Sequence, residues 1–378
     1  MTMTEPIRMV DLRSQYLRIK PELDAAIQRV LDSSAFIQGT PVTEFEDNLA
    51  QYTGSKYVIS CGNGTDALTA ALMALGIGPG DEVVTTPFTF IATVEAIALV
   101  GATPVFVDVC EETFMLDADQ LEKAITPRTK AIIPIHLYGQ CAEMGSILRI
   151  AKQHNISVIE DACQAIGTEY TFADGSVKKA GTMGDIGCLS FFPSKNLGCY
   201  GDGGALMTQD AALAERLRMI CRHGSKERYR HDIIGINSRL DTLQAAVLNV
   251  KLNHLDEYIA ARQEAAKYYH QALCDIEWIT LPKNAPHSTH TCHQFTVKVK
   301  NGQRDALKQF LTDNGIPSMI YYPVPAHRQP AYACLNYCEG DFPVAEQLCN
   351  EVLSLPMHTE LTNAQLEHIC QTIKNFPI

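Results

Sequence analysis

The sequence predicts an α/β protein in which a large domain, with a mostly parallel sheet between helices, is followed by a smaller α+β domain. Two observations support this fold class. Short apolar strand candidates alternate with helical patterns between Val58 and Ala205, and such alternation is typical of parallel strands joined by crossover helices. After residue 273 the order of strands and helices becomes mixed. We expect the two domains at residues 13–250 and 251–378, a division that the length of 378 residues allows.

Each element is predicted from its apolar pattern. The strand candidates of the large domain are Val58–Ile59, 82–86, 104–107, 130–135, 157–159 and 187–191. The helical patterns between them are 65–75, 91–99, 117–124 and 144–153. A long helix rich in Ala, Leu, Gln and Lys is expected at 240–273, where it links the domains. The small domain then has strand candidates at 294–299 and 318–321 and helices at 304–314, 344–353 and 363–375.

Composition and charge argue against several classes of protein. The formal charge of -12 is unsuited to a nucleic-acid surface, although it leaves room for local basic pockets. No signal peptide is recognised at the start, and the longest apolar stretch, 92–109, is broken by Glu95 and Pro104, so no membrane span is expected. The 13 cysteines are scattered without a CxxC pair. We therefore expect reduced thiols in a cytoplasmic protein, with no metal site.

The most informative pair of residues is Lys195 and Asp161. Lys195 follows an apolar strand and precedes a glycine-rich segment, while Asp161 ends the preceding apolar strand. Pyridoxal phosphate chemistry requires such a pair: the lysine amine forms a Schiff base with the cofactor aldehyde, and the carboxylate holds a proton on the pyridine nitrogen. Most lysines after strands are solvated, but Lys195 lies among uncharged residues after two phenylalanines. Burial there would favour the neutral amine.

A candidate phosphate site lies directly after the first strand. In the segment 62–67, Gly64 and Thr65 open a predicted helix, and backbone N–H groups at a helix start beside a threonine hydroxyl suit one phosphate. The alternative is an ordinary helix cap made by Asn63 or Thr65. No Walker motif follows, and the glycines of 198–204 open no recognisable helix, so a dinucleotide fingerprint is set aside.

Four further candidates have two interpretations each. Phe88, after a strand, suits stacking on a flat cofactor ring, or packing in the core. Gln164, three residues after Asp161, is placed to reach the same ring, or is an ordinary loop residue. Asn237 and Arg239 offer an amide and a guanidinium to a phosphate or carboxylate, or mark a helix start.

An aromatic, partly basic loop in the small domain contains Tyr321, Tyr322 and His327. Such a loop suits the mouth of a substrate pocket, although polar loops of this composition are common. We interpret these three residues as candidate substrate contacts.

Together, five motifs in order resemble the sugar-nucleotide aminotransferases of the DegT family, which are fold type I pyridoxal phosphate enzymes. The motifs are GNGTDAL at 62–68, PFTF at 87–90, EDACQ at 160–164, SFFPSKNLGCYGDGG at 190–204 and NSRLDTLQA at 237–245. The resemblance extends from Val10 to His358. Each motif alone is weak, but all five in this order are specific.

The resemblance implies a role for each matching residue. Lys195 is expected to be the Schiff-base lysine and proton shuttle, and Asp161 the partner of the pyridine nitrogen. The other cofactor contacts that it implies are Gln164 at the ring hydroxyl, Phe88 on the ring face, and Gly64, Thr65 and Ser190 at the phosphate.

The resemblance also implies a homodimer, because Asn237 is expected to reach the phosphate bound by the other subunit. Arg239 is expected near the substrate. L-Glutamate is the expected amino donor, and the acceptor is a nucleotide-linked keto sugar.

The closest branch of the family implies amination of the 3-keto group of UDP-2-acetamido-2-deoxy-3-oxo-glucuronate, for bacterial surface polysaccharide such as lipopolysaccharide. One departure concerns Tyr321, which stands where that branch has a histidine. The alternative substrate is therefore a dTDP-linked 3-keto-6-deoxyhexose. A sugar dehydratase, in which histidine replaces the lysine, and a non-enzymatic regulator fit the intact Lys195 less well.

Overall fold

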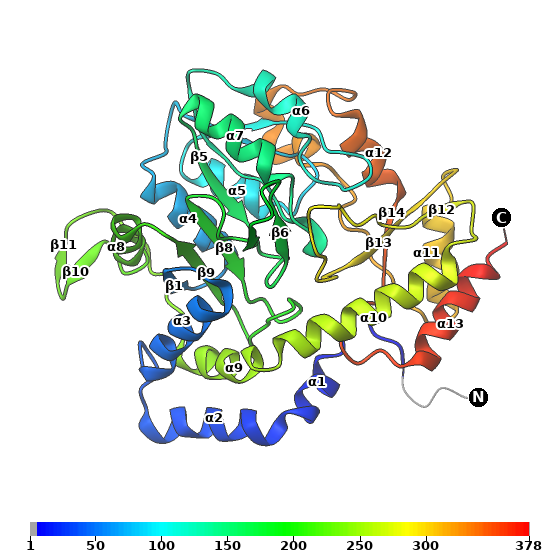
Figure 1. Cartoon of the computed structure of the whole chain (residues 1–378), viewed down its shortest axis with the longest axis horizontal. Coiled ribbons are helices and arrows are strands. Elements are labelled where there is room, and N and C mark those ends of the chain that lie inside the picture. The colour runs from blue at the N-terminus through cyan, green and yellow to red at the C-terminus, as the bar shows by residue number, and fades with distance from the viewer. Residues whose placement is uncertain (1–5, 378) are drawn as a thin grey trace.

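A seven-stranded sheet forms the centre of the larger part of the computed structural model, which describes residues 6–377 (Figure 1). Its order is β1-β9-β8-β5-β4-β2-β3. The strands are β1 Tyr57–Cys61, β2 Glu82–Thr85, β3 Thr103–Phe106, β4 Thr129–Ile132, β5 Ser157–Asp161, β8 Ile186–Ser190 and β9 Gly204–Thr208. Only β9 runs against its neighbours. The predicted mostly parallel sheet is therefore confirmed.

Helices cover both faces of this sheet, because neighbouring residues of each buried strand point to opposite sides. In β5, Val158 packs with the face covered by α3, α7 and α9, whereas Ile159 packs with the face covered by α4, α5 and α8. The helices of this part are α1 Leu12–Arg18, α2 Lys20–Ser33, α3 Thr40–Thr53, α4 Gly64–Ala74, α5 Ala92–Leu99, α6 Ala118–Leu121, α7 Met144–His154, α8 Ala211–Ile220 and α9 Thr242–Leu252. Asp161 and Ser190, the last residues of β5 and β8, are polar and belong to neither apolar cluster.

The long helix expected at 240–273 is two helices. Helix α9 ends at Leu252, and α10 begins at Leu255 and continues to Leu273. Asn253 and His254 separate them, and asparagine and histidine are only moderate helix formers. The sequence has no proline or glycine at this point to mark the break.

The smaller part contains a three-stranded antiparallel sheet of β12 Ile279–Thr280, β13 Phe295–Val299 and β14 Val352–Leu355. Its helices are α10, α11 Arg304–Asp313, α12 Pro343–Glu351 and α13 Asn363–Lys374. The strand expected at 318–321 is only an isolated bridge between Met319 and Ser354. Strand β14 overlaps the end of a helix expected at 344–353, so α12 is shorter than predicted. The proposed domain boundaries stay predictions.

The structure also has shorter elements. They are the hairpin strands β6 Glu169–Thr171, β7 Val177–Lys179, β10 Ser225–Glu227 and β11 Arg230–His231, and the 3-10 helices η1 Glu122–Ala124, η2 Leu137–Gly139, η3 Ala326–Arg328 and η4 Pro330–Leu335. The β10–β11 hairpin projects from one end of the molecule (Figure 1). None of the helices within residues 6–377 combines the length and the apolar character that crossing a membrane needs.

Candidate functional site

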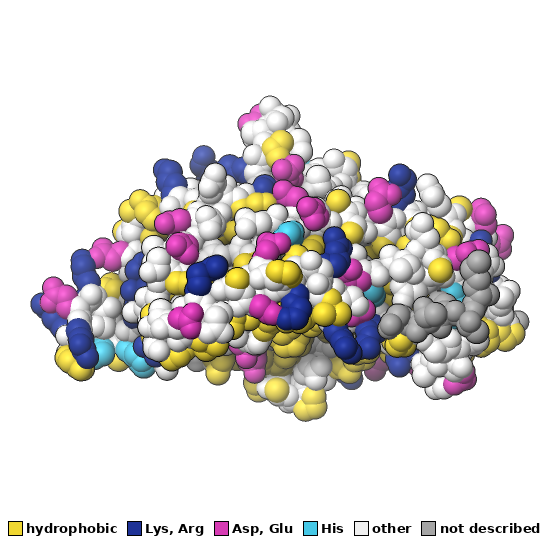
Figure 2. All heavy atoms as spheres, turned by 90° about the horizontal axis from the view of Figure 1, so that it is seen from below, with side chains coloured by type: hydrophobic (Ala, Val, Ile, Leu, Met, Phe, Trp, Pro, Cys, Tyr) yellow, Lys and Arg dark blue, Asp and Glu magenta, His cyan; other side chains and the backbone are white. Residues whose placement is uncertain are grey.

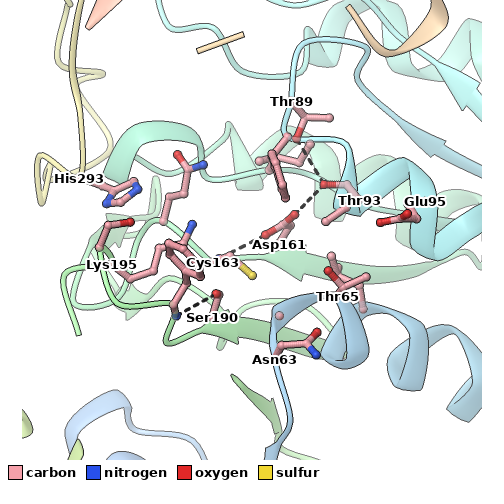
Figure 3. A pocket seen from close by; sticks show the side chains of 18 of the residues that line it. Asn63, Thr65, Thr89, Thr93, Glu95, Asp161, Cys163, Ser190, Lys195 and His293 are labelled. Carbon is pink, nitrogen blue, oxygen red and sulfur yellow. Dashed lines mark hydrogen bonds between the residues drawn. The ribbon is translucent and has the colours of Figure 1, made fainter. Parts of the chain in front are cut away.

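A cavity of about 710 Å³ lies at the carboxyl ends of β5 and β8 (Figure 3). The two strands are parallel neighbours, with Asp161 paired to Cys188, so their ends meet at one edge of the sheet. Side chains from the sheet, from α4 and α5 and from the small-domain loops line the cavity. The residues that line it include Asn63, Gly64, Thr65, Phe90, Thr93, Asp161, Cys163, Gln164, Ser190, Lys195, His293, Tyr321 and Tyr322.

Lys195 lies on a tight loop that follows β8. The loop is closed by backbone hydrogen bonds from Lys195 N–H to the Phe192 carbonyl, at 2.8 Å, and from Cys199 N–H to the Phe191 carbonyl, also at 2.8 Å. It needs glycine at 198, since a Cβ there would lie 2.3 Å from a backbone oxygen. Burial lowers the pKa of the Lys195 amine, and the nearby Cys163 and Asp161 oppose this only in part. The amine is thus predisposed to act as a neutral nucleophile and base.

Asp161 is the last residue of β5 and is 7% exposed. Its Oδ2 accepts a hydrogen bond from the Thr93 hydroxyl at 2.8 Å, and its Oδ1 accepts one from the Cys163 N–H at 3.2 Å. Thr93 is itself 3.3 Å from the Thr89 hydroxyl. These contacts, drawn in Figure 3, fix the direction of the carboxylate in the cavity wall. Thr93 was not predicted, although Thr89 and Thr93 are one helical turn apart in the sequence.

Glu160 precedes Asp161 and is fully buried. Its Oε1 accepts hydrogen bonds from the N–H groups of Met183 and Gly184, both at 2.6 Å. Its Oε2 accepts from the Gly181 N–H and contacts His136 Nε2, both at 2.8 Å. This carboxylate therefore anchors a loop and the strand end.

The start of α4 forms one wall of the cavity. Asn63 caps the helix by accepting a hydrogen bond from Asp66 N–H at 2.8 Å, so the alternative interpretation as a helix cap is correct for this residue. Gly64 and Thr65 nevertheless line the cavity with Ser190. A Cβ at Gly64 would lie 2.8 Å from the Ser190 Cβ. The structure thus brings together the three residues predicted to hold a phosphate.

Gln164 connects the large domain to the aromatic loop. Its Oε1 accepts a hydrogen bond from the Tyr138 N–H at 2.8 Å, and its Nε2 donates to the Tyr322 hydroxyl at 3.1 Å. Tyr321 and Tyr322 both line the cavity. Two of the three predicted loop residues therefore lie at the site.

The structure does not place Phe88 or His327 in the cavity. Phe88 is 1% exposed and packs against Phe114 behind the cavity wall, whereas Phe90 of the same motif lines the cavity and is 55% exposed. His327 is buried, 3.0 Å from Glu346 Oε1, and its ring packs on that of Phe342. Phe88 is thus part of the core, and His327 is hydrogen-bonded to Glu346 inside the protein.

Asn237 and Arg239 also lie outside the cavity formed by this chain. Asn237 is exposed and forms a bridge with Arg222, while Arg239 is half-buried. Between them, the Ser238 hydroxyl donates a hydrogen bond to Asp66 Oδ2 at 2.7 Å, which ties this segment to the start of α4.

His293 lines the cavity and was missed by the sequence interpretation. It lies in the small domain, 5% exposed, just before β13. The sequence shows no local sign of this position, because the contact depends on how the two domains pack.

Proteins of known sequence resemble nearly the whole chain. A model of the DegT/DnrJ/EryC1/StrS aminotransferase family matches residues 17–374. A UDP-2-acetamido-2-deoxy-3-oxo-D-glucuronate aminotransferase of Pseudomonas aeruginosa is 47% identical over 98% of this chain and 100% of its own length. A pleiotropic regulatory protein of Geobacillus stearothermophilus is 47% identical over 98% of both chains. A dTDP-3-amino-3,4,6-trideoxy-alpha-D-glucose transaminase of Streptomyces venezuelae is 41% identical, over 99% of this chain and 97% of its own.

Solved structures show the same fold. The crystal structure of S. venezuelae DesV superposes with a TM-score of 0.94, at 42% identity and 98% coverage of both chains. That of ntda from Bacillus subtilis, with the bound cofactor PMP, has a TM-score of 0.86 at 31% identity, covering 97% of this chain and 83% of its own. The predicted family, fold class and aminotransferase class are confirmed. The chain belongs to the DegT/DnrJ/EryC1/StrS aminotransferase family.

Proposed function

We propose that this protein is a pyridoxal phosphate-dependent aminotransferase that moves the amino group of L-glutamate to the 3-keto group of a nucleotide-linked sugar. The observation that carries the proposal is the placement of Lys195 and Asp161 at the ends of adjacent strands, in one cavity that also contains the start of α4. Relatives of similar length that act on nucleotide sugars support the class of substrate.

The residues of the cavity fit pyridoxal 5′-phosphate, which is the cofactor of this aminotransferase family. A buried amine with a lowered pKa is available at Lys195, and Asp161 is oriented by Thr93. The absence of a Cβ at Gly64 opens space beside Ser190 at a helix start. When bound, the cofactor supplies an aldehyde for the amine and a ring that accepts electrons.

Each residue then has a defined task. We propose that Lys195 Nζ removes and returns the proton at the carbon that gains or loses nitrogen. The Asp161 carboxylate would hold the proton on the ring nitrogen. Gly64, Thr65 and Ser190 hold the phosphate through N–H and hydroxyl donors. The ring contacts predicted for Gln164 and Phe88 stay proposals, and Phe90 is the aromatic side chain of that motif that lines the cavity.

We further propose that the active unit is a homodimer located in the cytoplasm. Support for the dimer comes from Asn237, which is exposed and lies outside its own chain's cavity. The neighbouring β10–β11 hairpin projects from the body, and Tyr229 and Ile234 next to it are 83% and 84% exposed. Figure 2 shows basic, acidic, histidine and hydrophobic side chains together at this end of the molecule. In the proposed dimer, Asn237 and Arg239 complete the site of the partner.

The proposed sugar is UDP-2-acetamido-2-deoxy-3-oxo-glucuronate, for surface polysaccharide biosynthesis. Similarity to the Pseudomonas aeruginosa aminotransferase supports it. The alternative, a dTDP-linked 3-keto-6-deoxyhexose, is supported by the Streptomyces venezuelae transaminase and by Tyr321, which lines the cavity where the uronate branch is expected to have histidine.

A substrate screen tests the proposal. Purified protein with pyridoxal phosphate is incubated with L-glutamate and UDP- or dTDP-linked 3-keto or 4-keto sugars, and 2-oxoglutarate release is followed. We expect release with one 3-keto sugar and none from Lys195→Ala. Loss of oxygen without gain of nitrogen would indicate a dehydratase instead. Turnover of no keto sugar, together with specific DNA or protein binding, would favour a regulator.

A further inference from the structure

His293 shares the cavity with Lys195 (Figure 3). Among the cavity residues within 6–377, Lys195 and His293 are the only two with basic side chains. Both lie toward the same end of the cavity in Figure 3, away from the start of α4. The His293 imidazole therefore lies in the same part of the cavity as the amine that is proposed to carry protons.

The backbone around His293 is held tightly and is tied to the lysine loop. The His293 N–H donates to the Tyr138 carbonyl at 2.8 Å, and the His293 carbonyl accepts from Arg262 Nη1 at 3.2 Å. Asn196, directly after Lys195, donates through Nδ2 to the Thr291 carbonyl at 2.9 Å. The imidazole and the amine are thus carried by segments that are hydrogen-bonded to each other.

Burial lowers the pKa of the His293 imidazole well below its ordinary value, and the nearby Lys195, Arg262 and His290 lower it further, which favours the neutral ring. The other titratable groups that act on Lys195 are the Cys163 thiol and the Asp161 carboxylate.

A neutral imidazole carries one proton, on Nδ1 or on Nε2. Nδ1 of His293 is buried and has no hydrogen-bond partner within residues 6–377. Buried donors without an acceptor are rarer in proteins than acceptors without a donor. The proton is therefore assigned to the other ring nitrogen, Nε2. His293 thus presents an N–H donor, and not a cation, to the space beside Lys195.

We propose that His293 is a positioning residue for Lys195: its Nε2–H donates a hydrogen bond to the lone pair of the free Lys195 amine, which holds that amine neutral and directed at the reacting carbon. A donor to the neutral form of an amine favours that form over the ammonium ion. His293 therefore acts in the same direction as burial. This inference rests on the proposed function, because it assigns a partner to the proposed proton carrier.

The test uses apoprotein prepared with hydroxylamine, to which pyridoxal phosphate is added. The rate at which the visible band forms is measured from neutral to alkaline pH, and its midpoint reports the ionisation of the Lys195 amine. In His293→Phe we expect this midpoint to rise by about one pH unit, the size that one lost hydrogen bond between neutral groups corresponds to. In His293→Gln, which keeps an N–H donor near the Nε2 position, we expect the midpoint to stay within about 0.3 units.

His290→Asn is the matched control. His290 lies in the same turn, where its Nδ1 accepts a hydrogen bond from Cys292 N–H at 2.9 Å, but it does not line the cavity. We expect its midpoint to equal that of the wild type. If His293→Phe does not fold, as judged by thermal unfolding, His293→Asn takes its place, because its shorter amide does not reach the Nε2 position.

Two results would overturn the inference. One is an unchanged midpoint in the variants that lack the donor, and the other is an equal shift in His290→Asn, which would attribute the effect to the turn. A wild-type protein that forms no visible band with pyridoxal phosphate would overturn the proposed function and this inference together. A visible band in the wild type, with the same midpoint in the wild type and in the variants that lack the donor, would overturn this inference alone.

Discussion

Replacing Glu160 by glutamine should destabilise the protein strongly, whereas replacing its neighbour Asp161 by asparagine should greatly reduce turnover with little loss of stability. The two substitutions are the same chemical change, a carboxylate to an amide, at adjacent positions. Alternation along β5 directs Glu160 into the protein and leaves Asp161 at the cavity. The pair therefore separates a folding role from a catalytic role.

The magnitude follows from the partners of Glu160. Each carboxylate oxygen accepts two hydrogen bonds, one oxygen from Met183 and Gly184 N–H and the other from Gly181 N–H and His136 Nε2. His136 donates because its Nδ1 already accepts a backbone N–H. In glutamine one oxygen becomes an NH₂ group, which leaves two buried donors without acceptors at about 1–3 kcal/mol each. We therefore expect Glu160→Gln to cost about 3–5 kcal/mol.

Asp161→Asn leaves no buried donor without an acceptor. The remaining oxygen accepts the Cys163 N–H, and the Thr93 hydroxyl turns to accept from the new amide, so stability should change by less than about 1 kcal/mol. An amide holds no proton on the ring nitrogen, so turnover should fall by about 10²- to 10⁴-fold.

Urea unfolding at neutral pH, followed by circular dichroism, measures both stabilities, and 2-oxoglutarate release measures turnover. Equal loss of stability in the two variants would refute the assignment of Glu160 as the anchor. Normal turnover in Asp161→Asn would refute the assignment of Asp161 as the group beside the ring nitrogen.

Three further predictions concern residues around the lysine loop and the cavity. Lys251 is buried, donates to the Gly198 carbonyl at 2.7 Å, and has a pKa lowered by burial to about 8. In the unfolded chain the pKa of this amine is about 10.5, so between pH 8 and 10.5 the unfolded chain binds the proton and the folded chain does not. The free energy of unfolding of the wild type, relative to that of Lys251→Met, should therefore rise by about 3 kcal/mol over this pH range. Urea titrations at several pH values measure it. Thr93→Val removes the donor to Asp161 and should weaken pyridoxal phosphate binding about tenfold in a spectroscopic titration, with recovery in Thr93→Ser. Gly64→Ala, whose Cβ would meet a side-chain carbon at 2.8 Å, should weaken binding of pyridoxal phosphate by about tenfold or more but leave binding of pyridoxal, which lacks the phosphate, unchanged.

The sequence predicted the parts of the site that depend on local order. Lys195 and Asp161 each follow a short apolar strand, and strand ends in a parallel sheet meet at one edge. Gly64 and Thr65 open a helix directly after a strand, which places them at the same edge. These relations need only the positions of strands and helices, so they could be predicted before the structure.

Features that depend on packing between distant segments could not be predicted. His293 reaches the cavity from the small domain, and nothing near it in the sequence marks that contact. Phe88 and Phe90 both belong to an irregular segment, where no alternation tells which ring faces the cavity. His327 is hydrogen-bonded to Glu346, which lies 19 residues further along the chain. The break between α9 and α10 likewise has no proline or glycine to signal it.

The attachment point of the cofactor is the most direct test of the proposed chemistry. The protein is mixed with pyridoxal phosphate, reduced with borohydride, digested, and analysed by mass spectrometry. We expect the phosphopyridoxyl group on the peptide that contains Lys195, and no label at that site in Lys195→Ala. Label confined to another lysine, such as the buried Lys251, with Lys195 unmodified, would contradict the assignment of the active site.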